Sequence, residues 1–205
     1  LKSREGEVIK LHDLLEEAIR RAEDAINQKN PDLVGEERKK VARTVGIGAV
    51  KYADLSTERT KDYIFDWERM LSFEGNTAPY LQYAYARICS IFRKWGGERD
   101  SLRDNFESLL KDELSILSKE ELTLSRRLVE FPTIVDESIT TFSPHKLCKH
   151  LHSVASSFAS FYENCSILKE ENAMLSTRRL ALCDLTAREL QLGLGIMGID
   201  VPERM

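Results

Sequence analysis

Two tyrosines and an arginine recur at helical spacing within one short stretch of the chain. Tyr80, Tyr83 and Arg87 stand at positions i, i+3 and i+7, so a helix would place all three on one face. Flat aromatic rings and a guanidinium plane suit unstacked single-stranded bases, which proteins hold by stacking and read at their edges. The same spacing is also typical of aromatic side chains that pack in a core with their hydroxyl groups hydrogen-bonded. The spacing alone leaves both interpretations open.

The residues before this stretch predict where its helix begins. Gly75 and Asn76 tolerate unusual backbone angles, which favours a turn and a domain boundary near Gly75. Thr77 can then cap the helix, and Pro79 fits its first turn, where a missing N–H costs little. We expect the helix to end at Gly96, since glycine breaks helices. Its core-facing stripe, at i, i+4, i+7 and i+11, is Leu81, Tyr85, Ile88 and Phe92.

Apolar periodicity and capping signals predict helices along the rest of the chain. Ser118 and Glu121 form a capping-box sequence, and their helix is expected to stop at Phe131–Pro132. Ser143 and Ser176 are further expected N-caps. The first expected helices cover residues 11–28, a stretch that starts near residue 36, and a short turn at 68–72. The later ones cover about 101–114, 119–131, a short helix that ends at 139, 144 to about 162, and 176–194. Two of them carry apolar stripes, at Leu147, Leu151, Val154 and Phe158 and at Leu180, Cys183, Ala187, Leu190 and Leu194. One aromatic run, Asp62–Trp67, suits a strand or an extended link. We therefore expect a mainly all-α fold, built as a helical bundle.

Composition limits the kinds of partner. The 205 residues carry 30 Lys and Arg against 34 Asp and Glu, a formal net charge of −4. This argues against a nonspecific nucleic-acid coat but leaves room for a structured RNA that meets a local basic face. No apolar run is long enough to cross a bilayer and no signal peptide is present, so we expect a cytoplasmic protein with no membrane partner. The four cysteines form no Cys-x-x-Cys pair and are expected to be small buried side chains: Cys89, Cys148, Cys165 and Cys183.

Two short patterns suggest chemistry that their surroundings do not support. His145, Cys148 and His152 would share a helix face, but no fourth ligand is apparent nearby, so we expect no metal site. A solvated, partly basic helix face is favoured instead, and such a face could lie beside RNA phosphates. Residues 193–198 fit G-x-G-x-x-G by letter, yet they follow a helix, and only a short tail comes after them. We expect these glycines to fray or end the last helix.

Three longer motifs occur in order and are together more specific than any single short pattern. They are Val45–Leu55 (VGIGAVKYADL), Gln82–Arg87 (QYAYAR) and Gly198–Met205 (GIDVPERM). Through them the whole chain resembles class I arginyl-tRNA synthetases. The resemblance implies that residues 1–74 are the mostly helical C-terminal end of a Rossmann catalytic domain. It implies that residues 75–205 are an all-helical anticodon-binding domain.

The resemblance also implies roles for particular residues. It assigns the tRNA anticodon pocket to Tyr80, Tyr83, Arg87, Tyr162 and Met205. For Arg87, binding to a phosphate or pairing with a carboxylate inside the bundle remains open as an alternative. It matches the second ATP-binding signature loop, a catalytic element of these enzymes, to Lys2, Ser3 and Arg4. Glu5 departs from that signature, because a small residue is usual there. The site residues therefore fall at the two ends of the chain and in the helices between.

The implied activity is the joining of arginine to AMP with ATP and Mg²⁺, followed by transfer of arginine to the terminal ribose of arginine tRNA. The chain opens without an initiator methionine, inside a motif, and holds no His-x-Gly-His signature. We therefore expect a monomeric fragment that recognises the anticodon arm, binds neither ATP nor Mg²⁺ and does not aminoacylate alone. Two hypotheses remain beside this one: a non-catalytic helical RNA-binding paralogue, and a protein-interaction module that uses the tyrosine face against a partner helix.

Overall fold

The structure, a computed structural model, describes residues 10–62, 65–104 and 117–205, and all regular structure within them is helical. The helices are α1 (Leu11–Lys29), α2 (Gly35–Leu55), α3 (Trp67–Met70), α4 (Ala78–Trp95), α5 (Ser101–Asp104), α7 (Lys119–Thr140), α8 (Pro144–Asn164) and α9 (Ala173–Ile196). The predicted all-α fold class is therefore confirmed. The described part of the aromatic run at 62–67 forms no strand, and its last residue begins α3. Lys2, Ser3 and Arg4, and most of the helix expected at 101–114, lie outside the described residues.

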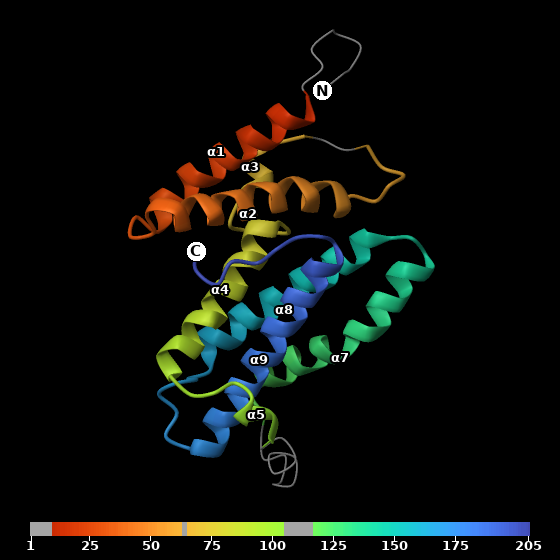
Figure 1. Ribbon diagram of the computed structural model, residues 1–205. Coiled ribbons are helices and arrows are strands. Elements are labelled where there is room, and N and C mark those ends of the chain that lie inside the picture. Colours follow the sequence, from red (N-terminus) through yellow and green to blue (C-terminus); the bar gives the residue numbers. More distant parts are fainter. Residues whose placement is uncertain (1–9, 63–64, 105–116) are drawn as a thin grey trace.

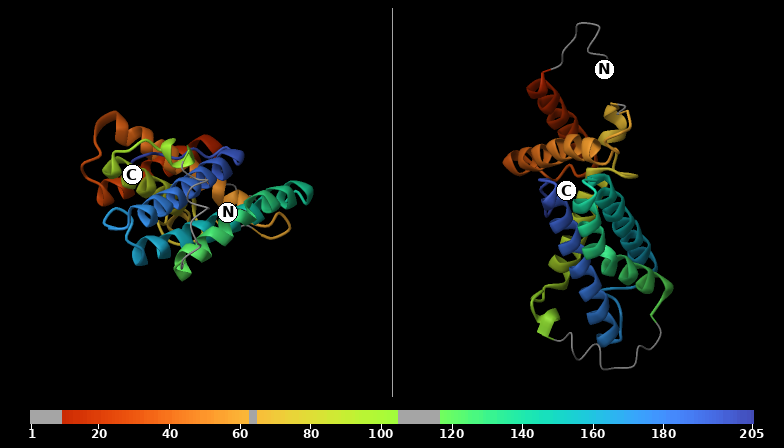
Figure 2. Two further views of the ribbon diagram at one scale, coloured as in Figure 1. Left: turned by 90° about the horizontal axis from the view of Figure 1, so that it is seen from below. Right: turned by 90° about the vertical axis from the view of Figure 1, so that its right-hand side faces the viewer.

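The helices form a bundle with a helical pair across one end. Helices α4, α7, α8 and α9 make the elongated bundle, and α1 and α2 lie across its end (Figures 1 and 2). Tyr52 of α2 belongs to the bundle core, and its hydroxyl lies 2.8 Å from the carbonyl oxygen of Cys148 on α8. A smaller apolar cluster lies between α1 and α2. Gly46 allows these two helices to approach closely, because an added Cβ would lie 2.7 Å from the carbonyl oxygen of Ala18.

Helix α4 is built as the sequence predicts. Thr77 Oγ1 accepts a hydrogen bond from the Tyr80 N–H at 3.3 Å, with Pro79 in the first turn. Gly75 and Gly96 take φ values of 79° and 72° at the two ends, where a left-handed backbone favours glycine. The predicted core stripe is buried: Leu81, Tyr85, Ile88 and Phe92. The predicted stripes of α8 and α9 are buried as well.

Helix α7 does not stop at Phe131–Pro132, and that prediction is wrong. The helix runs through Pro132 to Thr140. Pro132 is exposed, and as a proline it has no N–H to donate to the carbonyl of Leu128 one turn earlier. Phe131, Ile134 and Val135 pack against the bundle core on both sides of the proline. Tertiary packing therefore sustains the helix where the local sequence favours a break.

Helix α8 begins at Pro144 as predicted, but Ser143 does not cap it through its side chain, and α9 begins earlier than predicted. Ser143 precedes α8, but its Oγ donates a hydrogen bond to the Thr141 carbonyl at 3.0 Å and caps nothing. Helix α9 begins at Ala173, because Asn172 Oδ1 accepts hydrogen bonds from two backbone N–H groups. Ser176 therefore lies inside the helix, and its Oγ donates to the Ile167 carbonyl at 3.0 Å. Gly193 also differs from expectation: it is buried inside α9, and an added Cβ would lie 2.6 Å from Leu151 Cδ2.

The C-terminal tail folds back along the molecule. It runs from the end of α9 to lie between α2 and α4 (Figure 1). Gln82 Nε2 and Arg93 Nη1, both on α4, donate hydrogen bonds to the carbonyl oxygens of Asp200 and Glu203 at 2.8 Å and 3.0 Å. These bonds order the last residues of the chain. The four cysteines are free and buried, as predicted.

Candidate nucleic-acid interface

One arginine of α4 lies between two tyrosine rings. The guanidinium carbon of Arg87 is 4.9 Å from the Tyr83 ring centroid and 5.1 Å from the Tyr162 ring centroid. Arg87 Nη2 also donates a hydrogen bond to Tyr83 Oη at 3.0 Å. Tyr83 and Arg87 stand one turn apart on α4, whereas Tyr162 belongs to the last turn of α8. The packing of α4 on α8 thus creates a cation–π arrangement, which we call the Arg87 stack.

The Arg87 stack lines an open cavity of about 450 Å³. The C-terminal tail contributes Arg204 and Met205 to the lining. Asn30 Nδ2, just after α1, donates a hydrogen bond to the Met205 carbonyl at 3.2 Å, and the Met205 side chain packs on the apolar cluster between α1 and α2. We call this space the Met205 cavity. The structure therefore brings four of the five residues of the expected pocket together: Tyr83, Arg87, Tyr162 and Met205.

The fifth residue, Tyr80, is placed differently. Its ring packs against the bundle core and lies 5.6 Å from the His152 ring of α8, and it is not among the residues that line the Met205 cavity. Burial raises the pKa of the Tyr80 hydroxyl, and a hydrogen bond with Ser156 opposes that shift. Tyr162, in contrast, remains 39% exposed although it is a large aromatic residue. Tyr80 therefore fits the packing interpretation, while part of Tyr162 remains exposed to solvent.

The histidine–cysteine pattern on α8 does not gather into a ligand set. Within the described residues, no three His, Cys, Asp or Glu side chains are placed to hold a metal ion. Cys148 is fully buried, and burial raises the pKa of its thiol to about 12, so the thiol stays protonated. Burial lowers the pKa of His152, which therefore favours its neutral form. These two side chains serve the packing of α8.

The Met205 cavity is basic although the chain is acidic overall. Three arginines line it, Arg87, Arg93 and Arg204, and no Asp or Glu residue does. Arg204 pairs with Glu37 at 3.9 Å, whereas Arg87 and Arg93 form no ion pair within the described residues. A cavity that combines a partly exposed aromatic ring with two such guanidinium groups attracts a planar, anionic ligand. A nucleotide has both properties.

Comparison with known proteins identifies the family. The model of the DALR anticodon binding domain matches residues 81–205. The chain belongs to the DALR anticodon binding domain family. A second family model, that of the class I tRNA synthetase (R) catalytic domain, matches residues 1–67. The two matches lie on either side of the boundary expected at residues 74 and 75, which stays a prediction.

Arginine–tRNA ligases are similar to this DALR protein along its whole length. The ligases of Cellvibrio japonicus and Proteus mirabilis are 49% and 48% identical to it over 205 and 204 residues. These matches cover 100% of this chain and 34% of each ligase, so the chain spans about a third of the length of these curated relatives. The solved arginyl-tRNA synthetase of Thermus thermophilus matches 97% of this chain and 32% of its own, with a TM-score of 0.84 and 33% identity. The solved arginyl-tRNA synthetase of Plasmodium falciparum matches 97% of this chain and 34% of its own, with a TM-score of 0.81 and 32% identity. The sequence resemblance to this enzyme family is therefore confirmed.

Some residues around the cavity of the DALR domain escaped sequence reasoning. The Phe73 ring meets the Tyr83 ring edge to face at a centroid distance of 6.3 Å, and Lys29 Nζ lies 4.8 Å from the centroid of Phe73. Asn30 anchors Met205, 175 residues further along the chain. No local pattern predicts contacts across such separations.

None of the described helices is long and apolar enough to cross a membrane.

Proposed function

We propose that this chain recognises the anticodon arm of an arginine tRNA as part of a longer arginine–tRNA ligase. The single observation that carries the proposal is the Arg87 stack, which opens into a basic cavity that no Asp or Glu residue lines. Membership of the DALR family and the similarity to arginine–tRNA ligases support the same reading. In the proposed complex a splayed anticodon base lies against the exposed part of Tyr162.

Each residue of the pocket has a distinct part in this proposal. Tyr162 and Tyr83 supply the aromatic faces, and Met205 supplies an apolar edge of the cavity. The remaining N–H groups of Arg87 donate to base carbonyls or to a phosphate, since no carboxylate in the described part of the chain occupies them. Tyr80 stands behind these residues and supports the contact between α4 and α8. The pocket is thus held in shape before RNA arrives, which lowers the entropy cost of binding.

The expected catalytic contribution is also part of the proposal. Residues 1–74 would complete the catalytic domain, and Lys2, Ser3 and Arg4 would belong to its ATP-binding loop. The whole enzyme would be a cytoplasmic monomer that uses ATP, Mg²⁺ and arginine. The described residues of this chain offer no cluster of side chains that fits Mg²⁺. We therefore assign this chain no catalytic step with ATP or with Mg²⁺. Because the chain contains no His-x-Gly-His run, we propose that it does not aminoacylate by itself.

Binding to matched RNAs tests the proposal. The chain is titrated with an arginine tRNA transcript and with the same transcript altered only in its anticodon, at two salt concentrations. We expect a clear loss of affinity for the altered transcript at both, because base contacts carry sequence information and phosphate contacts do not. We also expect Tyr83→Ala to weaken binding of the unaltered transcript by about 1–3 kcal/mol. Equal, salt-sensitive binding of the two transcripts would overturn anticodon recognition, and unchanged affinity of Tyr83→Ala would overturn the stacking role.

A further inference from the structure

A second cavity adjoins the Met205 cavity across the Arg87 stack. It has a volume of about 390 Å³ and shares Arg87, Ser90 and Tyr162 with the first. Its remaining lining comes from the second half of α4 and from the loop that joins α8 to α9, residues 165–172. We call it the loop cavity. The two spaces therefore share part of their walls and are adjacent on the surface.

The lining of the loop cavity combines positive charge with apolar surface. Lys94 of α4 and Lys169 of the loop add two ammonium groups to the guanidinium of Arg87, and no Asp or Glu residue lines the space. Neither lysine forms an ion pair within the described residues, and both are exposed. Leu168 is 41% exposed and lines the same cavity as Ile91. This combination suits an anionic phosphate that carries a flat, weakly polar base.

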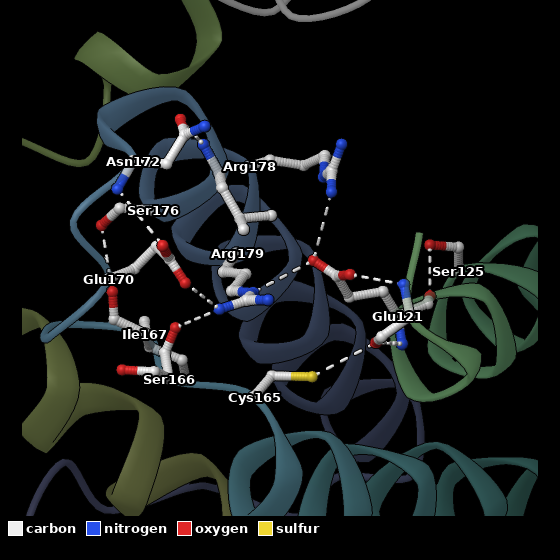
Figure 3. Close-up of polar contacts among 12 residues, drawn as sticks. Glu121, Ser125, Cys165, Ser166, Ile167, Glu170, Asn172, Ser176, Arg178 and Arg179 are labelled. Atoms are coloured by element: carbon white, nitrogen blue, oxygen red, sulfur yellow. Dashed lines mark hydrogen bonds and ion pairs between the residues drawn. The ribbon is translucent and has the colours of Figure 1, made fainter. Parts of the chain in front are cut away.

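The loop that forms one wall is held by a buried arginine of α9. Arg179 Nη1 donates hydrogen bonds to the Ser166 carbonyl at 2.6 Å and to Glu170 Oε2 at 2.7 Å (Figure 3). Its Nε donates to Glu121 Oε1 on α7 at 3.2 Å. Cys165, where the loop begins, lies with its Sγ 3.3 Å from Ser118 Oγ. The wall is therefore tied to α7 and α9 before any ligand binds, which preorganises the cavity.

We propose that the loop cavity binds the nucleotide adjacent to the one in the Met205 cavity on the same RNA strand. Lys94 and Lys169 bind its phosphate, and Leu168 contacts its base. The inference rests on the proposed function, because the occupant of the first cavity sets the occupant of the second. Charge complementarity and the shared Arg87 and Tyr162 favour an RNA strand over an acidic peptide.

The test couples two lysines to one phosphate. The protein forms are the chain, the double variant Lys94→Gln/Lys169→Gln, and a control variant, Lys39→Gln/Lys61→Gln. The control makes the same change in net charge at two exposed lysines of the N-terminal helical region that line neither cavity. The probe is the anticodon stem-loop RNA of an arginine tRNA, with each loop phosphate replaced in turn by a neutral methylphosphonate. Circular dichroism checks that the variants remain folded.

One modified position should distinguish the two lysines from general charge. For unmodified RNA we expect the double variant to bind about tenfold more weakly than the chain. Its salt dependence should fall by about 0.7 in log–log slope, because the two lysines together neutralise one phosphate of a single strand. At one methylphosphonate position the unsubstituted chain should also lose about tenfold in affinity, and the double variant should lose nothing further. Equal losses in the control variant, or additive losses at every position, would overturn the loop cavity as a phosphate site.

The same titrations separate this inference from the proposed function. If the unsubstituted chain binds cognate and altered anticodon loops equally, the proposed function fails, and the assignment of adjacent nucleotides fails with it. If the chain discriminates between them while the double variant behaves like the control, only the loop cavity fails. Discrimination together with the coupled phosphate supports both.

Discussion

Two arginines organise two regions of this molecule in opposite ways. Arg179 is buried, and its guanidinium meets the carboxylates of Glu121 and Glu170 and a backbone carbonyl (Figure 3). Arg87 is half-buried between two tyrosine rings, and its one hydrogen bond within the described residues goes to a tyrosine hydroxyl. The first charge is neutralised inside the protein, whereas the second is not. An arginine whose charge is met by carboxylates inside the protein stabilises the fold, and one that pairs with no carboxylate and lies beside a cavity is available to a ligand.

The largest expected effect separates the two arginines by stability. Arg179→Met leaves Glu121, whose side chain is 1% exposed, without its main cationic partner. We expect a loss of about 3 kcal/mol in the free energy of unfolding, the lower end of the range for breaking a buried ion pair, because Arg178 Nη2 still lies 3.6 Å from Glu121 Oε1. Urea unfolding followed by circular dichroism measures it. The double variant Glu121→Gln/Arg179→Met should regain part of the loss, since the stranded charge is gone. A smaller loss for Arg179→Met than for Arg87→Met would break the comparison.

The matching change at Arg87 should act on binding. Arg87→Met keeps the length and apolar character of the side chain but removes the charge and its donors. We expect affinity for arginine tRNA to fall by about 2–3 kcal/mol, because charge-assisted hydrogen bonds to RNA are removed, while the free energy of unfolding changes little. Filter binding and urea unfolding measure the two quantities. Arg127→Met, at an exposed position on α7, serves as the control. A loss in Arg127→Met as large as that in Arg87→Met would assign the effect to net charge alone.

The sequence could predict what is local in these regions, and it missed what is distant. The cap at Thr77, the break at Gly96 and the capping box at Ser118 depend on residues within one turn, and all three are observed. The Arg179 region, which comprises Arg179 with Glu121 and Glu170, joins Glu121 and Arg179 across 58 positions, and no pattern in the sequence pairs these two residues. The contact between Arg87 and Tyr162 likewise depends on how α8 packs on α4. Only the family resemblance placed Tyr162 and Met205 near the tyrosines of α4.

The rings around Arg87 should have unequal effects on binding. Tyr162→Ala removes the exposed ring, and we expect it to weaken tRNA binding by about 1–2 kcal/mol, since base stacking is removed. Tyr162→Phe keeps the ring and should bind like the unsubstituted chain. Tyr80→Phe should leave affinity unchanged, because Tyr80 lies outside the lining of both cavities. Isothermal titration with the tRNA transcript measures all three. A loss in Tyr162→Phe equal to that in Tyr162→Ala would show that the hydroxyl, and not the ring face, matters.

The smallest expected effect is a difference in how acid acts on the two regions. Burial raises the pKa of the Glu121 carboxyl, but hydrogen bonds from the Ser118 N–H and from Arg179, together with the positive charges of Arg178 and Arg179, outweigh it, and the pKa lies below its ordinary value of 4.5. As the pH falls, Glu121 is therefore protonated at a higher pH in the unfolded chain than in the folded chain. The stability that Glu121 contributes is present above pH 4.5 and is lost as the pH falls through its lowered pKa.

Unfolding free energies measured by urea between about pH 3 and pH 6 test this difference. Many carboxylates titrate in that range, so the useful quantity is the difference between each variant and the unsubstituted chain. For Glu121→Gln the difference should shrink as the pH falls, because the unsubstituted chain loses there what the variant has already lost. For Arg87→Met the difference should stay constant, since no carboxylate in the described residues pairs with Arg87. A constant difference for Glu121→Gln would mean that the pKa of Glu121 is the same in the folded and the unfolded chain. The contrast between the two arginines would then rest on burial alone.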